Sequence, residues 1–313
     1  MISAAAGGCN APSLLITPVQ NTTALTEQQV QPGRGWDKVA IVEVEGMLAN
    51  ARGGGLLGPG ENPVSLFAQQ MDRAAADRAV KAVVLRVNSP GGTVTASDTM
   101  YEVVRRFRQR TGKPVVAATQ EMATSGAYYV ACAADQIVVH PTSVVGSIGV
   151  IFNTVEFSGT MAKLGVSTDA VKSGKLKDMA SPFKPLSAEE RRVMQGMVDE
   201  YFGRFRTIVA SRRGLDSTAA LDAVTDGRVF TGRNAVELGL ADRTGMLEDA
   251  LDLARQLGLS PNAKAVRYTR PYGYGGSIYA TGPKDPPQAN VLHLQLPETR
   301  ATLPTGFYYL WLP

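Results

Sequence analysis

The chain has 313 residues, of which 44% are hydrophobic and 19% charged; this supplies a sizeable core and excludes wholesale disorder. Its 32 basic residues exceed its 28 acidic residues by only 4, with no concentrated basic block, so no nucleic-acid partner is predicted. Two cysteines and two histidines exclude a disulfide framework and a His-rich metal site, and we predict no metal and no other cofactor.

The first 35 residues contain only two charged side chains, Glu27 and Arg34, and show no hydrophobic period. We interpret residues 1–35 as a leader or linker. The small residues that precede Cys9 resemble the processing site of a bacterial lipoprotein, so the segment is predicted to be a truncated lipoprotein signal with a lipid anchor at Cys9. The alternative is an ordinary N-terminus. No run of about 18 apolar residues occurs, so no membrane-spanning helix is predicted.

Strands and helices alternate through the middle of the chain. Apolar, β-branched runs of strand length predict strands, whereas apolar residues at three- and four-residue steps predict helices. Because successive parallel strands need crossover connections, the fold class is α/β, with parallel strands and helices packed outside them. The predicted strands are 38–44, 82–87, 114–118 and 137–139, and the predicted helices begin at Pro63 and cover 97–110, 188–213 and 247–257.

The C-terminal boundary of the predicted domain follows from the last helices and the residues after them. The helix at 188–213 has one apolar stripe, which is typical of a core or subunit-interface helix. Residues 259–313 hold many prolines and tyrosines without a helical period, so they are predicted to form an extended, irregular tail. The predicted domain therefore covers residues 36–258.

Candidate catalytic residues lie where strands end. In open α/β sheets, ligands bind beyond the carboxyl ends of the strands. The turn 88–92 leaves a strand there with two glycines, and Ser125 lies at a similar junction between a strand and a helix. A serine that begins a helix is usually only an N-cap, but the same position suits a nucleophile.

A serine nucleophile needs a base. His140 precedes a proline and His293 lies in the tail, so neither is an attractive partner. A lysine can replace histidine only when neutral, which requires its ordinary pKa of about 10.4 to fall by roughly three units. The segment 171–182 offers Lys172, Lys175 and Lys177, and composition alone does not choose among them.

Five motifs in order resemble one known family. The resemblance runs from about Val39 to Gly258, over two thirds of the chain, and the motifs that carry it are RVNSPGG at 86–92, ATSGAYYVA at 123–131, VGSIGV at 145–150, KSGKLKDMASP at 172–182 and RVFTGRNAVELGLAD at 228–242. The sequence is similar to the bacterial signal peptide peptidase A family, also called protease IV, whose members are Ser–Lys peptidases of the Clp protease and crotonase superfamily. The resemblance implies a crotonase-like fold in a single repeat.

The resemblance also implies roles for individual residues. Ser125 matches the family's nucleophile, Lys177 its general base, and Ser147 the hydroxyl that orients the lysine amine. Gly92 and the amide of Gly126 match the oxyanion hole. Within the same motifs, Gly91 and Tyr128 are predicted to contact substrate; for Tyr128 and its neighbour Tyr129, the alternative to lining the substrate groove is packing in the core. Lys172 and Lys175 remain the competing bases.

The single copy of each motif resembles the short members of the family, in which adjacent subunits complete each active site within a ring. The resemblance therefore implies a homo-oligomer that binds peptide substrates, located in the cell envelope as a membrane-associated or exported protein. The apolar end of the chain, residues 305–313, resembles a substrate peptide, and we predict that it lies in the protein's own groove or packs on a neighbour.

Three functions are compatible with these motifs. The preferred one is a serine endopeptidase that degrades cleaved signal peptides and other unfolded apolar segments. A non-catalytic oligomeric scaffold that binds peptides is the first alternative. The second is a crotonase-like acyl-CoA enzyme, which would use the two backbone amides to stabilise an enolate and would not need Ser125 or Lys177.

Overall fold

A computed structural model describes residues 24–51, 54–55, 58–59, 61–270 and 305–311 of the chain. Cys9 and most of the predicted leader lie outside these residues, as does most of the predicted tail. Within them, no helix is both long and apolar enough to cross a lipid bilayer.

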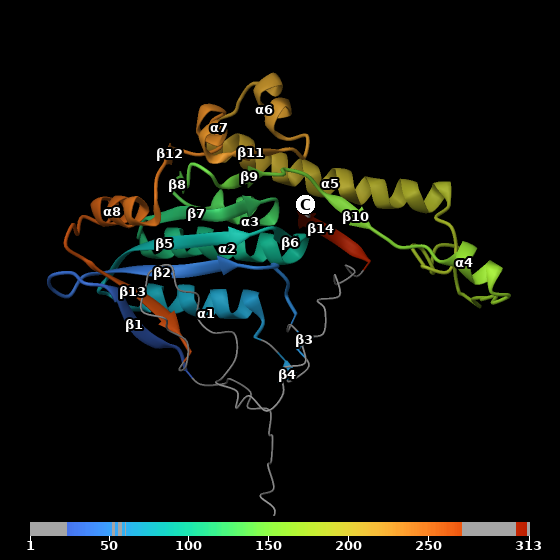
Figure 1. Ribbon diagram of the computed structural model, residues 1–313, viewed down its shortest axis with the longest axis horizontal. Helices are drawn as coiled ribbons and strands as arrows, with labels where there is room; N and C mark the ends of the chain where they lie inside the picture. The colour runs from blue at the N-terminus through green and yellow to red at the C-terminus, as the bar shows by residue number, and fades with distance from the viewer. Residues whose placement is uncertain (1–23, 52–53, 56–57, 60, 271–304, 312–313) are drawn as a thin grey trace, which may run out of the picture.

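A mostly parallel sheet forms the centre of the molecule (Figure 1). Its principal strands are parallel, and helices connect β2 to β5, β5 to β7 and β7 to β8, whereas β1 at one edge runs antiparallel to its neighbour. In spatial order the strands are β1 (Thr26–Gln31), β13 (Lys264–Thr269), β2 (Lys38–Glu45), β5 (Val80–Ser89), β7 (Val115–Thr124), β8 (Gln136–Val139) and β12 (Arg243–Thr244).

Helices cover both faces of this sheet. Alternate side chains of β2, β5 and β7 point to opposite faces, so the strands contribute to two separate apolar cores. The larger core lies under α1 (Pro63–Ala76), α2 (Val94–Thr111), α3 (Gly126–Ala131) and the second half of α5 (Ala188–Arg213), and the smaller core lies under α8 (Leu247–Leu257). The predicted α/β class with outer helices is therefore confirmed.

Shorter elements extend the sheet at the end where α3 begins. β9 (Val144–Gly146) runs parallel to the last residues of β7 and pairs on its other side with β11 (Val229–Thr231). The helices α6 (Thr218–Val224) and α7 (Gly232–Glu237) flank β11 in the chain. Near the glycine-rich segment, β3 (Gly54–Gly55) and β4 (Gly58–Pro59) form a small antiparallel pair.

A second, three-stranded sheet lies beside the carboxyl end of β5. It consists of β10 (Ile151–Asn153), β14 (Gly306–Leu310) and β6 (Gly91–Thr93), with β14 in the middle and antiparallel to both neighbours. Residues from the far end of the chain are thus paired with the Ser-Pro-Gly-Gly turn.

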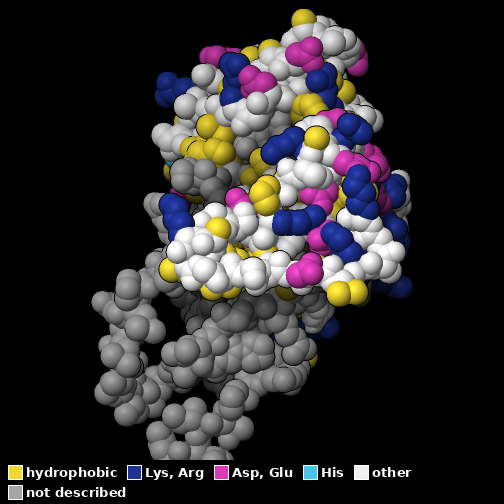
Figure 2. All heavy atoms as spheres, turned by 90° about the vertical axis from the view of Figure 1, so that its right-hand side faces the viewer, with side chains coloured by type: hydrophobic (Ala, Val, Ile, Leu, Met, Phe, Trp, Pro, Cys, Tyr) yellow, Lys and Arg dark blue, Asp and Glu magenta, His cyan; other side chains and the backbone are white. Residues whose placement is uncertain are grey.

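An arm projects from the body of the protein (Figure 1). It consists of α4 (Ser158–Lys163), the segment 164–187 and the first turns of α5. Figure 1 shows α4 beyond the N-terminal end of α5, away from β7 and α3. Figure 2, which views the molecule from this end, shows apolar side chains among acidic and basic ones. Leu164 and Val171 of the arm are exposed, as is Phe157, which immediately precedes it.

The structure differs from the prediction at both ends of the folded region. β1 lies within the segment interpreted as leader or linker, and β13 lies within the segment interpreted as irregular tail. These two strands pair with each other, from Thr26 with Thr269 to Gln31 with Ala265. The prediction of irregular structure is therefore wrong for residues 26–31, 264–269 and 306–310, because strands that are far apart in the sequence stabilise one another.

Candidate active site

Ser125 occupies a strained position between β7 and α3. Its φ of 52° and ψ of −116° lie outside the usual regions for a residue with a side chain. The Ser125 N–H donates to the Gly146 carbonyl at 2.7 Å, while its own carbonyl accepts from the Tyr129 N–H at 2.9 Å. These bonds hold the serine at the start of α3, and its hydroxyl has no hydrogen-bond partner among the described residues. Such strain at a strand-to-helix turn is typical of a functional residue.

Ser147 lies beside Ser125 in the same chain. Thr124 pairs with Gly146 across β7 and β9, so the residues that follow them are neighbours. Ser147 also has a positive φ, 51°, and its N–H donates to the Arg228 carbonyl at 2.7 Å. The structure therefore brings together the two serines that the sequence placed 22 positions apart.

The three predicted glycines surround the same turn. Gly91 has a φ of 99°, which a residue with a side chain rarely adopts. A Cβ atom on Gly91 would lie 2.7 Å from the Gly126 nitrogen, and a Cβ atom on Gly126 would lie 2.2 Å from the Ser97 hydroxyl oxygen. A Cβ atom on Gly92 would lie 1.9 Å from the Leu48 carbonyl oxygen. A side chain at Gly91 would meet the backbone of α3 and one at Gly92 the backbone of Leu48, so glycine is required at both positions.

The three candidate lysines lie on the arm and not beside Ser125. Lys172 pairs with Asp178 at 2.6 Å, and Lys175 pairs with Glu189, whose hydrogen bond raises the pKa of the Lys175 amine. Lys177 is exposed and has no acidic partner among the described residues. A single chain therefore assembles Ser125, Ser147 and the glycines but leaves Lys177 apart from them.

Comparisons with known proteins assign the chain to a family. The sequence profile of peptidase family S49 matches residues 107–259. A protein of Enterococcus faecium named as the signal peptide peptidase SppA is 35% identical over 244 residues, covering 78% of this chain and 70% of its own length. A protein of Methanocaldococcus jannaschii named as a protease is 37% identical over 217 residues, covering 69% of each chain.

The chain belongs to the signal peptide peptidase A/protease 4 family, peptidase family S49. Protease 4 of Haemophilus influenzae is also similar, with 33% identity over 71% of this chain, which spans 35% of that longer protein. Membership makes the chain a serine-type peptidase and confirms the resemblance read from the five motifs.

One site residue is corrected by the structure of this family S49 chain. Tyr128, predicted to contact substrate, is fully buried, and its hydroxyl donates to the Leu240 carbonyl at 2.8 Å. Its role is to pack α3 against the segment after α7. Cys132, on the same short helix, is also buried, and burial raises the pKa of its thiol to about 12, which excludes a reactive thiolate at neutral pH.

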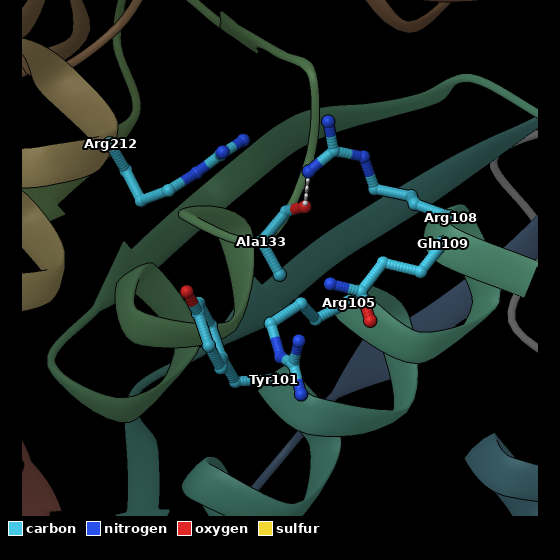
Figure 3. Close-up of a pocket in the computed structure, with 6 residues that line it drawn as sticks. All are labelled: Tyr101, Arg105, Arg108, Gln109, Ala133 and Arg212. Atoms are coloured by element: carbon cyan, nitrogen blue, oxygen red, sulfur yellow. Dashed lines mark hydrogen bonds between the residues drawn. The ribbon is translucent and has the colours of Figure 1, made fainter. Parts of the chain in front are cut away.

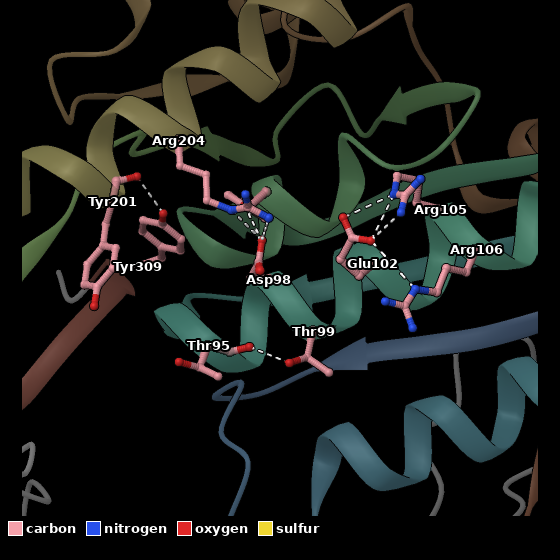
Figure 4. A network of polar contacts seen from close by, with 10 residues as sticks. Thr95, Asp98, Thr99, Glu102, Arg105, Arg106, Tyr201, Arg204 and Tyr309 are labelled. Carbon is pink, nitrogen blue, oxygen red and sulfur yellow. Dashed lines mark hydrogen bonds and ion pairs between the residues drawn. The ribbon is translucent and has the colours of Figure 1, made fainter.

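The neighbouring Tyr129 belongs to a polar network that the sequence did not reveal. Its hydroxyl donates to Asp98 at 2.5 Å, and the same carboxylate oxygen accepts from Arg204 on α5 at 2.7 Å (Figure 4). The Tyr129 ring stacks on Tyr309 of β14 at 5.1 Å between centroids. No sequence motif indicates this network, because its side chains come from α2, α3 and α5, which are far apart in the sequence.

A surface pocket of about 380 Å³ lies elsewhere, between α2 and the end of α5. Its arginines already have partners: Arg108 donates to the Ala133 carbonyl at 2.8 Å (Figure 3), and Arg212 donates to the Cys132 carbonyl at 2.9 Å. These bonds satisfy carbonyls at the end of α3. None of the predicted site residues lines this pocket, so it is not the substrate groove.

Proposed function

We propose that the protein is a serine endopeptidase that hydrolyses signal peptides and other unfolded apolar peptides through a Ser–Lys dyad of Ser125 and Lys177. The observation that carries the proposal is the strained Ser125 turn, which lies beside Ser147 and among three glycines in a chain of family S49. Backbone strain of this kind needs support from its surroundings, and it persists where it positions a reacting group.

The proposed chemistry follows from these positions. Neutral Lys177 accepts the Ser125 proton, and the serine oxygen attacks the carbonyl carbon of the scissile peptide bond. The backbone amides of Gly92 and Gly126 donate to the oxyanion that develops, and the loss of one such donor typically costs about 3 kcal/mol of transition-state stabilisation. The lysine then gives its proton to the leaving amine, and a water molecule that it activates hydrolyses the acyl-enzyme.

The proposed base comes from a neighbouring subunit. The arm carries Lys177 away from Ser125 of its own chain (Figure 1), and exposed apolar side chains on the arm offer a surface for a second copy. Contact with the neighbour would bury the lysine amine and place it near Ser147, whose hydroxyl would orient it. A ring of identical subunits, each giving a lysine to the next, satisfies this requirement.

The proposed location is the cell envelope, with the protein membrane-associated or exported. Its substrates, cleaved signal peptides, are apolar segments released at a membrane, so an enzyme that degrades them needs access to that surface. Lipid attachment at Cys9 would supply such access, and mass spectrometry of the protein from its native host would detect the added acyl mass.

A peptidase assay with a fluorogenic apolar peptide tests the proposed function. Wild type should cleave the peptide, whereas Ser125→Ala and Lys177→Ala should each lose activity by about a thousandfold or more, since dyad members act as a unit. Lys177→Arg should be equally inactive, because guanidinium does not release its proton near neutral pH. Lys172→Ala and Lys175→Ala are the matched controls and should keep most of the activity.

Two results would contradict the proposal in different ways. Cleavage that survives both Ser125→Ala and Lys177→Ala would show that these two residues do not form the catalytic dyad. Tight peptide binding by a wild-type protein that never cleaves would instead favour the non-catalytic scaffold.

A further inference from the structure

The surface pocket between α2 and the end of α5 is lined mainly by side chains that donate hydrogen bonds. Around Ala133 it has three arginines, a tyrosine and a glutamine (Figure 3): Arg105, Arg108, Arg212, Tyr101 and Gln109. Its volume of about 380 Å³ lies within the range of sites that hold small molecules. Among the described residues that line it, none is acidic.

Two of the arginines are anchored on the turn that follows α3. Arg212 donates from Nε to the Cys132 carbonyl at 2.9 Å and from Nη2 to the Ala134 carbonyl at 2.8 Å. Arg108 donates to the carbonyl between them, that of Ala133, at 2.8 Å. The two guanidinium groups therefore reach the same turn, one from α5 and the other from α2 (Figure 3). Because both are already held in place, a ligand that contacts them would cost little side-chain entropy.

These internal contacts leave several donors of the pocket unused. Arg105 donates to Glu102 from Nε and Nη2, and Arg212 also uses only Nε and Nη2, so Nη1 of each has no partner in the described part of the chain. The Tyr101 hydroxyl and the Gln109 amide make no hydrogen bond there either. Burial raises the pKa of Tyr101, so its hydroxyl keeps the proton that it can donate. Since guanidinium groups accept no hydrogen bonds, a ligand must supply the acceptors.

The charge of the pocket is positive. Glu102 pairs with Arg105, and Asp135 pairs with Arg108. Arg212 is bonded to backbone carbonyls, and no described carboxylate forms an ion pair with it. One positive charge is therefore left without a countercharge beside the unused donors, which favours an anion over a neutral ligand.

We propose that this pocket is a binding site for a phosphate group, carried by a small molecule or by a lipid headgroup. A phosphate offers several acceptor oxygens in a tetrahedral arrangement, which suits arginine donors that come from α2 on one side and α5 on the other. A carboxylate has two oxygens in one plane and would reach fewer of these donors. The bound phosphate would join α2 to α5 beside the last residues of α3, the helix whose N-cap is Ser125.

Titration of the full-length protein with inorganic phosphate tests for this site. At constant ionic strength, isothermal titration calorimetry should show one saturable site per chain with a Kd on the order of 1 mM, since so small a ligand makes few contacts. Malonate, a dicarboxylate, should bind about tenfold more weakly, because it presents its oxygens in planar pairs. The measurement involves no peptide cleavage, so its result is independent of the proposed peptidase function.

Arg105 and Tyr101 are the informative positions, because neither side chain satisfies a backbone carbonyl, as those of Arg108 and Arg212 do. Arg105→Gln should weaken phosphate binding about tenfold and Tyr101→Phe about threefold, since the first removes a charged donor and the second a neutral one. Arg106→Gln is the matched control: it removes the same charge from the same helix outside the pocket, so its Kd should stay close to that of wild type. Thermal melting checks that each variant is folded.

Vesicles distinguish the two sources of the phosphate. The probes are phosphatidylcholine vesicles with and without phosphatidic acid, a lipid whose headgroup is a phosphate monoester. Sedimentation of the protein with the phosphatidic acid vesicles alone, and its loss in Arg105→Gln, would assign the site to a lipid headgroup. Binding of inorganic phosphate without sedimentation would assign the site to a soluble phosphorylated molecule.

Three results would overturn the proposal. The first is a wild-type protein that binds neither inorganic phosphate nor the phosphatidic acid vesicles. The second is malonate binding as tight as phosphate binding, which would make the pocket a general anion site. The third is a folded Arg105→Gln protein that binds phosphate as wild type does, because the phosphate would then be an adventitious ion bound elsewhere on the surface.

Discussion

At the scale of single residues, backbone conformation distinguishes the site from the rest of the chain. Ser125 and Ser147 are two of four described non-glycine residues with positive φ, and they lie side by side. Positive φ costs free energy for a residue with a Cβ atom, so the surrounding hydrogen bonds must fix both turns. The sequence indicates the serines, but the φ angles follow from the strands that hold them.

Two adjacent tyrosines provide a prediction at this scale. Tyr128→Phe removes a buried hydroxyl and its bond to Leu240, so we expect it to lower the free energy of unfolding by about 1 kcal/mol and leave KM unchanged. Tyr129→Phe is the matched control, because it removes the hydroxyl of the adjacent tyrosine, which bonds to Asp98, and keeps the ring, which contacts Tyr309. Denaturant unfolding and peptide kinetics measure the two effects, and a raised KM for Tyr128→Phe would show that Tyr128 contacts substrate after all.

At the scale of elements, α5 joins two environments. Phe205 and Val209 in its second half lie in the main core, whereas Val193 in its first half is exposed. The capping box of Ser187 and Glu190 begins the helix, and Lys184 pairs with the Glu190 carboxylate, which ties the arm to the first turn of α5. The arm is thus held by polar contacts along its own length, and its apolar side chains remain available to another surface.

The ion pairs of the arm predict that the Asp178 carboxylate stays ionised to an unusually low pH. Hydrogen bonds from Lys172 and Lys184 lower the pKa of Asp178 to about 2. Because the folded-state pKa is depressed, the stabilisation from these pairs is present above the unfolded value of about 4 and is lost as the pH falls through about 2. NMR titration of the Asp178 carboxyl should give a midpoint near 2. A midpoint near 4 in wild type would show that the pairs do not form, and Lys172→Ala with Lys184→Ala should produce that value.

At the scale of the whole molecule, one chain contains only part of the proposed machinery. The sheet and its helices hold Ser125, Ser147 and the glycines together, while the arm holds Lys177 apart (Figure 1). This division explains why no base for Ser125 is found among the described residues of a single chain. Under the proposal of shared sites, the arm projects in order to carry Lys177 to a neighbouring subunit.

Complementation between two inactive variants tests this division. In a mixture of Ser125→Ala and Lys177→Ala subunits that assemble together, some sites combine an intact serine from one subunit with an intact lysine from its neighbour. Random assembly in a ring should restore about a quarter of the wild-type rate. The rate is measured after co-expression, with separately purified variants as controls. If each site uses its own lysine, the mixture stays inactive, and the proposal of shared sites fails.

The amino-acid sequence by itself determined the family, the α/β class, the serine turn and the glycines. These features are local: apolar periodicity defines strands and helices, and short motifs keep the spacing of the residues that touch at a turn. The choice of Lys177 among three lysines also rests on a local motif and stays a prediction; Lys172 and Lys175 form ion pairs with Asp178 and Glu189.

The tertiary structure alone decided the partners of residues far apart in the chain. β1 pairs with β13, and β14 pairs with β6, although the members of each pair are more than 200 positions apart in the sequence. Neither β1 nor β14 has a strong hydrophobic pattern of its own. It also decided that Tyr128 packs inward while Tyr129 faces β14, since one step along a short helix changes which neighbours a side chain meets. Such outcomes depend on which surfaces come together in space, and the order of residues along one segment does not specify them.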